Sequence, residues 1–153
     1  MMKRSGFTLV EMLVVIAIII LVSVVAVPAI TPFFKGQRLN KGARIVQASA
    51  LAARVMAINS RKTRWLEFDS VNYKLSIIDD LSVVVGKVEF LPDTIEFGTS
   101  TWPMGTSTVT VSFDPNGSAD TSTLGTDTVT IQDKQGNTKN LRIISYTGQI
   151  KSD

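Results

Sequence analysis

The residues best suited to chemistry lie in the segment Lys3–Met12. A short basic leader precedes Gly6 and Phe7, and Glu11 stands five residues after Gly6. Glu11 is the only charged residue of an apolar run that continues to Phe34. A carboxylate inside an apolar segment of bilayer length is costly unless it finds a partner, so it indicates a function. The pattern predicts that the leader is removed after Gly6, that Phe7 becomes a new amino terminus, and that Glu11 pairs with a positive group.

The segment Gly6–Met12 resembles the cleavage and methylation site of type IV prepilins and type II secretion pseudopilins. In that family a membrane peptidase cuts after the glycine and methylates the new phenylalanine amine. The resemblance therefore implies leader cleavage between Gly6 and Phe7 and N-methylation of Phe7. It also places the assembly glutamate of the family on Glu11 and its helix-kinking proline on Pro28. Because it covers about the first fifth of the chain, it identifies the class rather than the member.

Two other interpretations of this end are weaker. A secretory signal peptide would be cleaved near Val27–Ala29, but its apolar region is normally about 7–15 residues long, and Glu11 would have no role. A plain membrane anchor would leave the same glutamate unpaired inside the bilayer, which is costly.

The elements that position these residues begin with a helix. Residues 7–30 are long enough to cross a bilayer, and Pro28 should kink the helix because it removes a backbone donor. Small apolar residues then recur at three- and four-residue steps, which predicts that the helix resumes: Leu39, Ala43, Val46, Ala50, Ala53 and Ala57. Ile45, Ala48, Ala52 and Met56 widen this stripe. We expect it to pack on the chain's own head, on neighbouring subunits, or on both at different stretches.

From Arg64 onward the pattern predicts short strands. They are Trp65–Phe68, Tyr73–Ile78, Ser82–Val85, Lys87–Phe90, Thr94–Phe97, Thr108–Phe113, Thr128–Ile131, Lys139–Ile144 and Gln149–Lys151. The Ser/Thr/Gly-rich stretches 98–107 and 117–127 are expected to be exposed loops. A long amino-terminal helix packed on an antiparallel β-sheet head is an α+β, pilin-like architecture. We expect a cleaved leader at 1–6, a transmembrane and filament-core helix at 7–34, an amphipathic stalk helix at 35–62 and a β-rich head at 63–153.

Charge is distributed unevenly along the chain. Every charged residue from Lys35 to Arg64 is positive, whereas from Trp65 onward there are six Lys or Arg and twelve Asp or Glu. Lys3 and Arg4 precede the apolar run, which places that end in the cytoplasm by the positive-inside bias and the head in the periplasm. The resemblance implies a single-pass protein of the bacterial inner membrane, in contact with membrane lipid and later assembled into a filament.

A second, weaker resemblance is to the pseudopilin H and FimT-like group. It rests on Ala43-Arg44 with the small-residue helix 48–58, on Phe113–Gly117, on Leu141–Ile144 and on Tyr146–Ile150. That group holds minor subunits of type II secretion pseudopili and of type IV pili. It implies a structural subunit that helps export folded proteins across the outer membrane, or alternatively a minor pilin for pilus assembly, adhesion or DNA uptake. Implied partners are other pseudopilins or pilins, the prepilin peptidase and an assembly platform in the inner membrane.

DNA binding and catalysis are disfavoured. The DNA-binding members of that group have an arginine after the final glycine, where this chain has Gly148-Gln149, and the acidic head repels phosphates. The chain has no Cys and no His, so thiolate sites and imidazole triads are excluded. We find no enzyme motif and expect no cofactor. Asp114–Asp120 has the alternating oxygens of a calcium loop but lacks its glycine and final glutamate, so a side-chain-stabilised turn is the simpler interpretation. Trp102 is expected in the core, with an exposed contact as the alternative.

Overall fold

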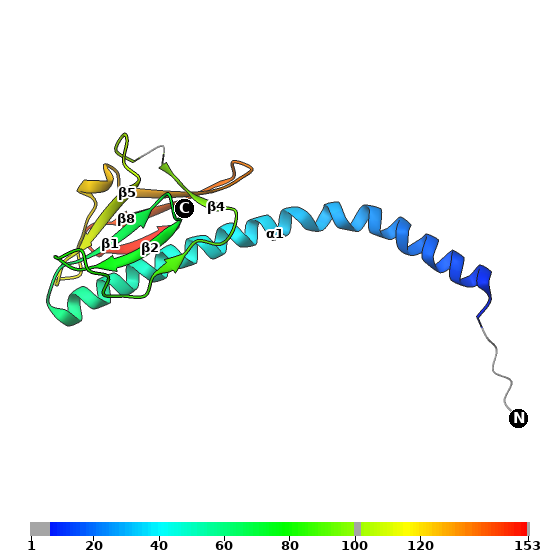
Figure 1. The fold of residues 1–153 in the computed structure, drawn as a ribbon, viewed down its shortest axis with the longest axis horizontal. Helices are drawn as coiled ribbons and strands as arrows, with labels where there is room; N and C mark the ends of the chain where they lie inside the picture. Colours follow the sequence, from blue (N-terminus) through cyan, green and yellow to red (C-terminus); the bar gives the residue numbers. More distant parts are fainter. Residues whose placement is uncertain (1–6, 100–101, 153) are drawn as a thin grey trace, which may run out of the picture. The chain divides into compact units, whose positions relative to one another are not determined.

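The computed structural model describes residues 7–99 and 102–152, without the side chains of residues 27–35. Two compact units divide the chain, Met1–Gly36 and Gln37–Asp153. The helix α1 (Leu9–Ser60) contributes residues to both units (Figure 1). It includes Pro28, and the kink expected there stays a prediction.

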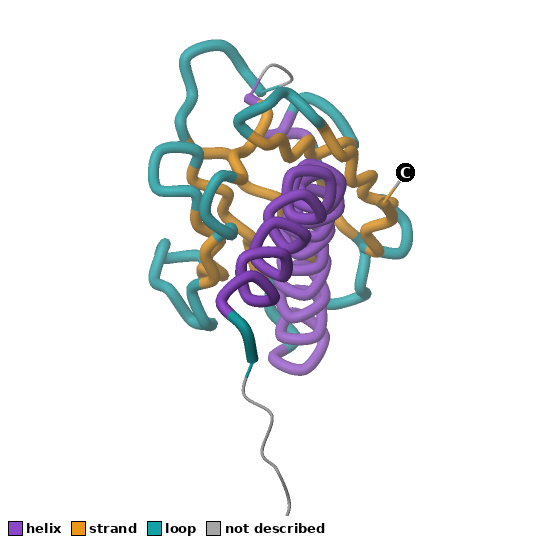
Figure 2. Tube along the Cα trace, turned by 90° about the vertical axis from the view of Figure 1, so that its right-hand side faces the viewer, coloured by secondary structure: helices purple, strands orange, loops and turns teal. Residues whose placement is uncertain are grey.

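The second unit contains two antiparallel sheets. The first has the strand order β3-β2-β1-β5-β6 and the second has the order β4-β7-β8-β9. Figure 1 labels β1, β2 and β5 of the first sheet and β4 and β8 of the second, and Figure 2 shows the strands in orange. The strands of the first sheet are β1 (Arg64–Asp69), β2 (Lys74–Ile78), β3 (Glu89–Phe90), β5 (Thr108–Phe113) and β6 (Ala119–Asp120). Those of the second are β4 (Ile95–Gly98), β7 (Thr128–Asp133), β8 (Thr138–Ile144) and β9 (Gln149–Ser152). This order of a long helix followed by antiparallel strands confirms the α+β, pilin-like fold class.

The strands form two sheets, where the sequence suggested one, because the chain turns sharply after β3. The amide of Ile95 donates to the carbonyl of Pro92 at 3.0 Å, and this turn directs β4 away from the first sheet. β4 then pairs with β7, with Ile95 opposite Asp133. The ring of Phe97 on β4 meets that of Phe68 on β1 edge to face, with centroids 5.7 Å apart, so the two sheets share one core.

The carboxyl-terminal half of α1 covers this core with small side chains. Ala43, Val46, Ala50, Ala53 and Ala57 are almost fully buried, each exposing 3% or less of its surface. We call these five residues the alanine seam. It packs in one cluster with residues of both sheets: Leu66, Phe68, Val111, Phe113, Val129, Ile131, Leu141 and Ile143. The stripe that the sequence predicted between residues 39 and 57 is therefore confirmed as a packing face on the chain's own head.

Two local expectations were wrong. Ser82–Val85 forms no strand and makes only the single bridge between Val84 and Ile78. The carboxylate of Asp79 accepts the amides of Leu81 and Val83, and these bonds hold the segment in a turn.

The stretch 117–127 was wrongly expected to be an exposed loop throughout. It forms β6 and the short 3-10 helix η2 (Ser122–Leu124), and Leu124 is fully buried. Short elements of this kind lack the periodicity that sequence patterns need. By contrast, Trp102 exposes 6% of its surface and packs 5.8 Å from Phe97 between ring centroids, which confirms the core assignment.

Candidate functional site

The candidate site is the start of α1, where the chain enters its apolar span. Leu9 is the first helical residue, and the amide of Met12 donates to the carbonyl of Thr8 at 3.2 Å. The hydroxyl of Thr8 accepts the amide of Glu11 at 3.3 Å, so Thr8 is the amino-terminal cap. Glu11 therefore lies in the first helical turn, where the helix dipole favours a negative charge.

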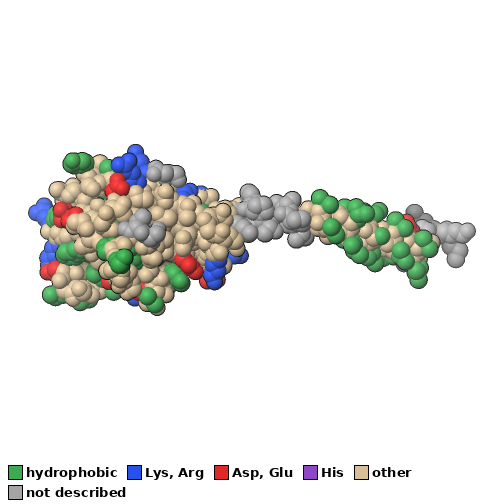
Figure 3. All heavy atoms as spheres, turned by 90° about the horizontal axis from the view of Figure 1, so that it is seen from above, with side chains coloured by type: hydrophobic (Ala, Val, Ile, Leu, Met, Phe, Trp, Pro, Cys, Tyr) green, Lys and Arg blue, Asp and Glu red, His purple; other side chains and the backbone are tan. Residues whose placement is uncertain are grey.

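The span that follows is apolar on every side. Leu9–Ala26 has a mean hydropathy of 3.1 and the length and composition to cross a membrane. None of this window is buried inside the protein, and Figure 3 shows hydrophobic side chains covering the corresponding described part of the molecule. The hydroxyl of Ser23 donates to the carbonyl of Ile19 at 2.7 Å, which satisfies this polar group within the helix. The span needs lipid or other apolar helices around it.

The structure brings two of the predicted site residues into the same short segment. Phe7 exposes 75% of its surface directly before the helix, and Glu11 is exposed one turn into it. Both are accessible to groups from another molecule. Gly6 lies outside the described residues, as does the side chain of Pro28, so the assignments of these two residues stay predictions.

The sequence analysis did not single out Thr8. Its signal was present in Thr8–Glu11, because Ser or Thr followed three residues later by Glu before an apolar run is typical of a capping box. The cap fixes where α1 begins and thereby fixes how far Glu11 stands from the chain end that cleavage would create.

In the head, the segments that carried the second resemblance meet at one place. The turn Asp114–Gly117 and the turn at Gly148 both lie against Arg54 of α1. The Nε of Arg54 donates to the carbonyl of Gly117 at 3.1 Å. A Cβ added at Gly148 would lie 2.5 Å from that same carbonyl oxygen, so only glycine fits there. These residues are structural, since they join α1 to the ends of both sheets.

The oxygen-rich segment Asp114–Asp120 is a hydrogen-bonded turn. Asp114 accepts the hydroxyl of Thr63 at 3.1 Å, and Asn116 accepts the amide of Ser118 at 2.9 Å. Asp120 accepts the amide of Ser122 at 2.8 Å. Asn116 and Asp120 thus stabilise the local backbone, as in Asx turns, whereas Asp114 joins this turn to Thr63 just before β1. Within residues 7–99 and 102–152, no three acidic, His or Cys side chains gather as a metal site.

The comparisons with known proteins agree with this geometry. Residues 1–27 match the family model described as the prokaryotic N-terminal methylation motif. The fold is similar to crystal structures of the type IV minor pilin FimU of Pseudomonas aeruginosa in two space groups. In one the TM-score is 0.55 at 19% identity, covering 80% of this chain and 92% of FimU. In the other it is 0.51 at 17% identity, covering 75% and 92%. No curated protein matches the chain in sequence.

Proposed function

We propose that this type IV pilin-like protein is a minor pseudopilin, a structural subunit of a type II secretion pseudopilus that helps export folded proteins across the outer membrane. The observation that carries the proposal is the uncovered apolar helix Leu9–Ala26, which follows Phe7 and has Glu11 in its first turn. A span with this exposure and a charge in its first turn is suited to leave lipid for a filament core, where neighbouring helices replace the lipid.

The mechanism that we propose is assembly rather than catalysis. The prepilin peptidase removes residues 1–6 after Gly6 and methylates Phe7, and the chain then waits in the inner membrane with its head in the periplasm. On assembly, the carboxylate of Glu11 pairs with the amine of Phe7 on a neighbouring subunit. A buried charge is tolerated only when it is paired, so this contact selects the register of the helices. Pro28 loosens the helix where it must adapt to its neighbours.

Two features favour a secretion pseudopilus. From Trp65 onward the head has twice as many acidic as basic residues, and Gln149 follows Gly148 in place of an arginine. Such a surface is poorly suited to gather nucleic acid. One observation favours the second candidate, a minor subunit of a type IV pilus. The solved structures that the fold resembles are of a type IV minor pilin.

A comparison of culture supernatants separates the two candidates. The gene is deleted and then restored, and the secreted proteins are quantified by mass spectrometry. Loss of a set of exported proteins, reversed by complementation, supports the pseudopilin. An unchanged secretome together with lost piliation or transformation contradicts it and supports the minor pilin.

The role of Glu11 has its own test. We expect Glu11→Ala to leave leader cleavage intact, since the carboxylate lies beyond the scissile bond, and to lower incorporation into the filament at least about tenfold, because the amine of Phe7 is left unpaired in the filament core. The mass of the mature chain reports cleavage, and crosslinking to neighbouring subunits reports incorporation. Replacing Gly6 by Leu is the matched control, because it should leave the precursor uncut. Normal incorporation of Glu11→Ala contradicts the pairing.

A further inference from the structure

Three positive residues follow the apolar run of the chain on one stretch of α1. Arg38, Lys41 and Arg44 come four, seven and ten residues after Phe34, and all three are exposed. None of the three forms an ion pair within the described residues. We call Arg38, Lys41 and Arg44 the basic cluster. Its charge is therefore free to meet a partner outside the chain.

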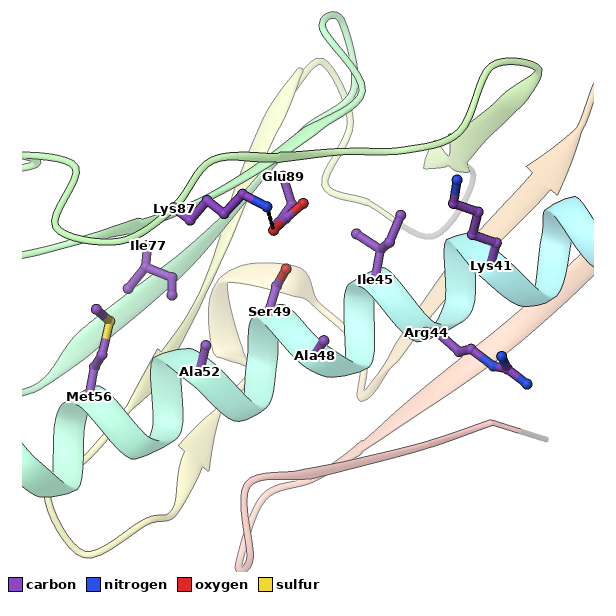
Figure 4. A pocket seen from close by; sticks show the side chains of 10 residues that line it. All are labelled: Lys41, Arg44, Ile45, Ala48, Ser49, Ala52, Met56, Ile77, Lys87 and Glu89. Atoms are coloured by element: carbon purple, nitrogen blue, oxygen red, sulfur yellow. Dashed lines mark ion pairs between the residues drawn. The ribbon is translucent and has the colours of Figure 1, made fainter.

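A groove with a volume of about 570 Å³ begins at the basic cluster and follows α1 in the second unit. Its lining on the helix includes Ile45, Ala48, Ala52 and Met56. On its other side Lys87 and Glu89 pair at 2.6 Å and neutralise each other (Figure 4). Figure 4 shows Lys41 and Arg44 beyond Ile45, pointing to different sides of the helix. The net positive charge of the groove is therefore confined to this end.

A second hollow, with a volume of about 460 Å³, adjoins the basic cluster and has apolar walls. Arg38 and Lys41 line it from α1, and Phe90 lines it from β3, where its side chain exposes 60% of its surface. Asp93 is the one acid among its described lining residues, so the hollow keeps a net positive charge. Positive side chains next to an exposed aromatic ring are typical of protein surfaces that bind at the boundary between lipid and water.

The second sheet adds positive charge at the same end of the unit. The Nζ of Lys139 on β8 donates to the Oδ1 of Asn40 at 2.7 Å, which ties the β7–β8 hairpin to α1 between Arg38 and Lys41. Lys134 is exposed in the turn of this hairpin. This end of the second unit is therefore basic both on α1 and on the second sheet.

The short length of chain after the apolar run keeps the basic cluster close to the membrane surface. α1 is continuous, so Arg38 and Lys41 lie at most about 6 and 10 Å of helix beyond Phe34. The headgroup layer adds about 5–8 Å to each side of the hydrocarbon core. Lys and Arg have long side chains whose charged ends extend toward polar surroundings. The basic cluster can therefore reach the phosphates of the leaflet from which the span emerges.

We propose that the basic cluster and Phe90 bind the phosphate headgroups of anionic lipids in the membrane that anchors the chain. Arg38 and Lys41 donate to phosphate oxygens, and the ring of Phe90 enters the boundary between headgroups and acyl chains. Each positive charge near an anionic lipid surface strengthens such binding about fivefold. The contact holds the head against the lipid surface until the chain is assembled. It needs the membrane anchor but not the secretion pseudopilus, so it goes beyond the proposed function.

Fluorescence quenching of the full chain in lipid nanodiscs tests this contact. The protein contains no Cys, so Gln135→Cys in the exposed turn of the β7–β8 hairpin provides a single site for a bimane fluorophore. A nitroxide on part of the lipid headgroups quenches the fluorophore when the head lies on the lipid. We expect at least about twofold stronger quenching when phosphatidylglycerol replaces part of the phosphatidylcholine. Leu81→Cys, beyond the end of β2 opposite the one that pairs with Phe90, is the control position and should show no such difference.

Two matched pairs of cations make the test specific. Arg38→Gln with Lys41→Gln should abolish the extra quenching in phosphatidylglycerol, because two charges of the basic cluster are lost. Arg61→Gln with Lys62→Gln, on exposed residues just after the other end of α1, should leave it unchanged. Equal quenching in the two lipid mixtures, or equal effects of the two double variants, overturns the proposal.

The contribution of the aromatic ring is measured separately. Phe90→Ser should weaken the quenching in both lipid mixtures, because it removes the apolar part of the contact. The remaining quenching should still fall as salt is added, since the charged part is screened by ions. Unchanged quenching of Phe90→Ser overturns the role of the ring.

Two further outcomes would assign the basic cluster to another partner. Inorganic phosphate is compared with sodium chloride at equal ionic strength, and we expect the same effect from both. If phosphate alone abolishes the quenching, the cluster binds the free anion and the lipid is the wrong ligand. If Arg38→Gln with Lys41→Gln keeps the quenching but loses crosslinks to neighbouring subunits in cells, the cluster binds a protein and the proposal is wrong.

The lipid contact and the proposed function fail separately. If phosphatidylglycerol makes no difference while the chain still supports secretion, the lipid contact is wrong and the proposed function stands. If the lipid contact is found but deletion of the gene leaves the secretome unchanged, the contact stands and the secretion pseudopilin is wrong.

Discussion

At the scale of single residues, two glycines with the same backbone conformation differ in their surroundings. Gly148 and Gly136 have φ angles of 61° and 85°. A Cβ at Gly136 meets nothing within 4 Å, whereas one at Gly148 meets the Gly117 carbonyl. We expect Gly136→Ala to cost about 1 kcal/mol of unfolding free energy and Gly148→Ala about 3 kcal/mol. Denaturant unfolding of the full chain in detergent, followed by tryptophan fluorescence, measures both. Equal losses would mean that the turns do not pack as described.

Asp69 makes the stability of the folded head depend on pH. Burial raises its pKa, but hydrogen bonds from the Asn72 side chain and from the amides of Asn72 and Val71, together with the charge of Lys74, lower the pKa below its ordinary value. A carboxyl group with a lowered folded-state pKa contributes stability that is present above the unfolded pKa and lost as pH falls through the folded pKa. This loss therefore lies below about pH 4.

Replacing Asp69 by Asn tests whether this carboxylate stabilises the head at neutral pH and ceases to do so in acid. We expect Asp69→Asn to be less stable than the unmodified chain at pH 7, because the hydrogen bonds from Asn72 and Val71 no longer reach a charged carboxylate and the ion pair with Lys74 is lost, and to approach it in stability below about pH 3. Thermal unfolding at a series of pH values provides the measurement. Asp80→Asn is the control, since the carboxylate of Asp80 has no hydrogen bond among the described residues. Parallel melting curves for Asp69→Asn and the unmodified chain at all pH values contradict the assignment.

At the scale of elements, α1 ends in a hydrogen-bonded motif that glycine usually completes. The amide of Lys62 donates to the carbonyl of Ala57 and that of Arg61 to Ile58, each at 3.3 Å, as in a Schellman motif. Arg61 has a φ of 52°, in the left-handed region. We expect Arg61→Gly to stabilise the head by about 1 kcal/mol, because glycine adopts this conformation without strain. Arg61→Ala removes the same charge and should give no such gain in denaturant unfolding.

The elements also show what a sequence pattern can and cannot predict. The alanine seam and β5 repeat with the periods of a helix and a strand, and their existence and position were predicted. The segment Ser82–Val85 has the composition of a strand, but the carboxylate of Asp79 accepts the amides of Leu81 and Val83 and holds the chain in a turn. Burial of one face of a helix or strand leaves a periodic pattern in the sequence. A turn held by one side chain depends on a single hydrogen-bond geometry and leaves no such pattern.

The functional surfaces, too, were predicted from the sequence only in part. Phe7 and Glu11 were predicted because their types and offset form a short local motif. The groove along α1 was not predicted, because it exists only where the first sheet stops at β3. Ile45, Ala48, Ala52 and Met56, which line it, belong to an ordinary apolar stripe in the sequence, and no local pattern indicates that Ala48 and Ala52 are left exposed.

At the scale of the whole molecule, the chain must be oriented in its membrane. We expect the head to face the periplasm, because Lys3 and Arg4 precede the span. Protease added to spheroplasts should then digest the head, and protease added to intact cells should spare it. A cytoplasmic protein serves as the control for lysis. Protection of the head in spheroplasts, with digestion after lysis, contradicts this orientation.

The alanine seam also constrains how the protein is made. The seam begins at Ala43, but it shares its core with Leu141 and Ile143, which are synthesised about a hundred residues later. At about 5–20 residues per second, the ribosome needs roughly 5–20 s to cover that distance. During this interval the apolar helix has already been made, while the second sheet, which completes the core around the seam, is still unfinished. The head therefore cannot complete its core until its last strands have been made, long after the amino-terminal helix.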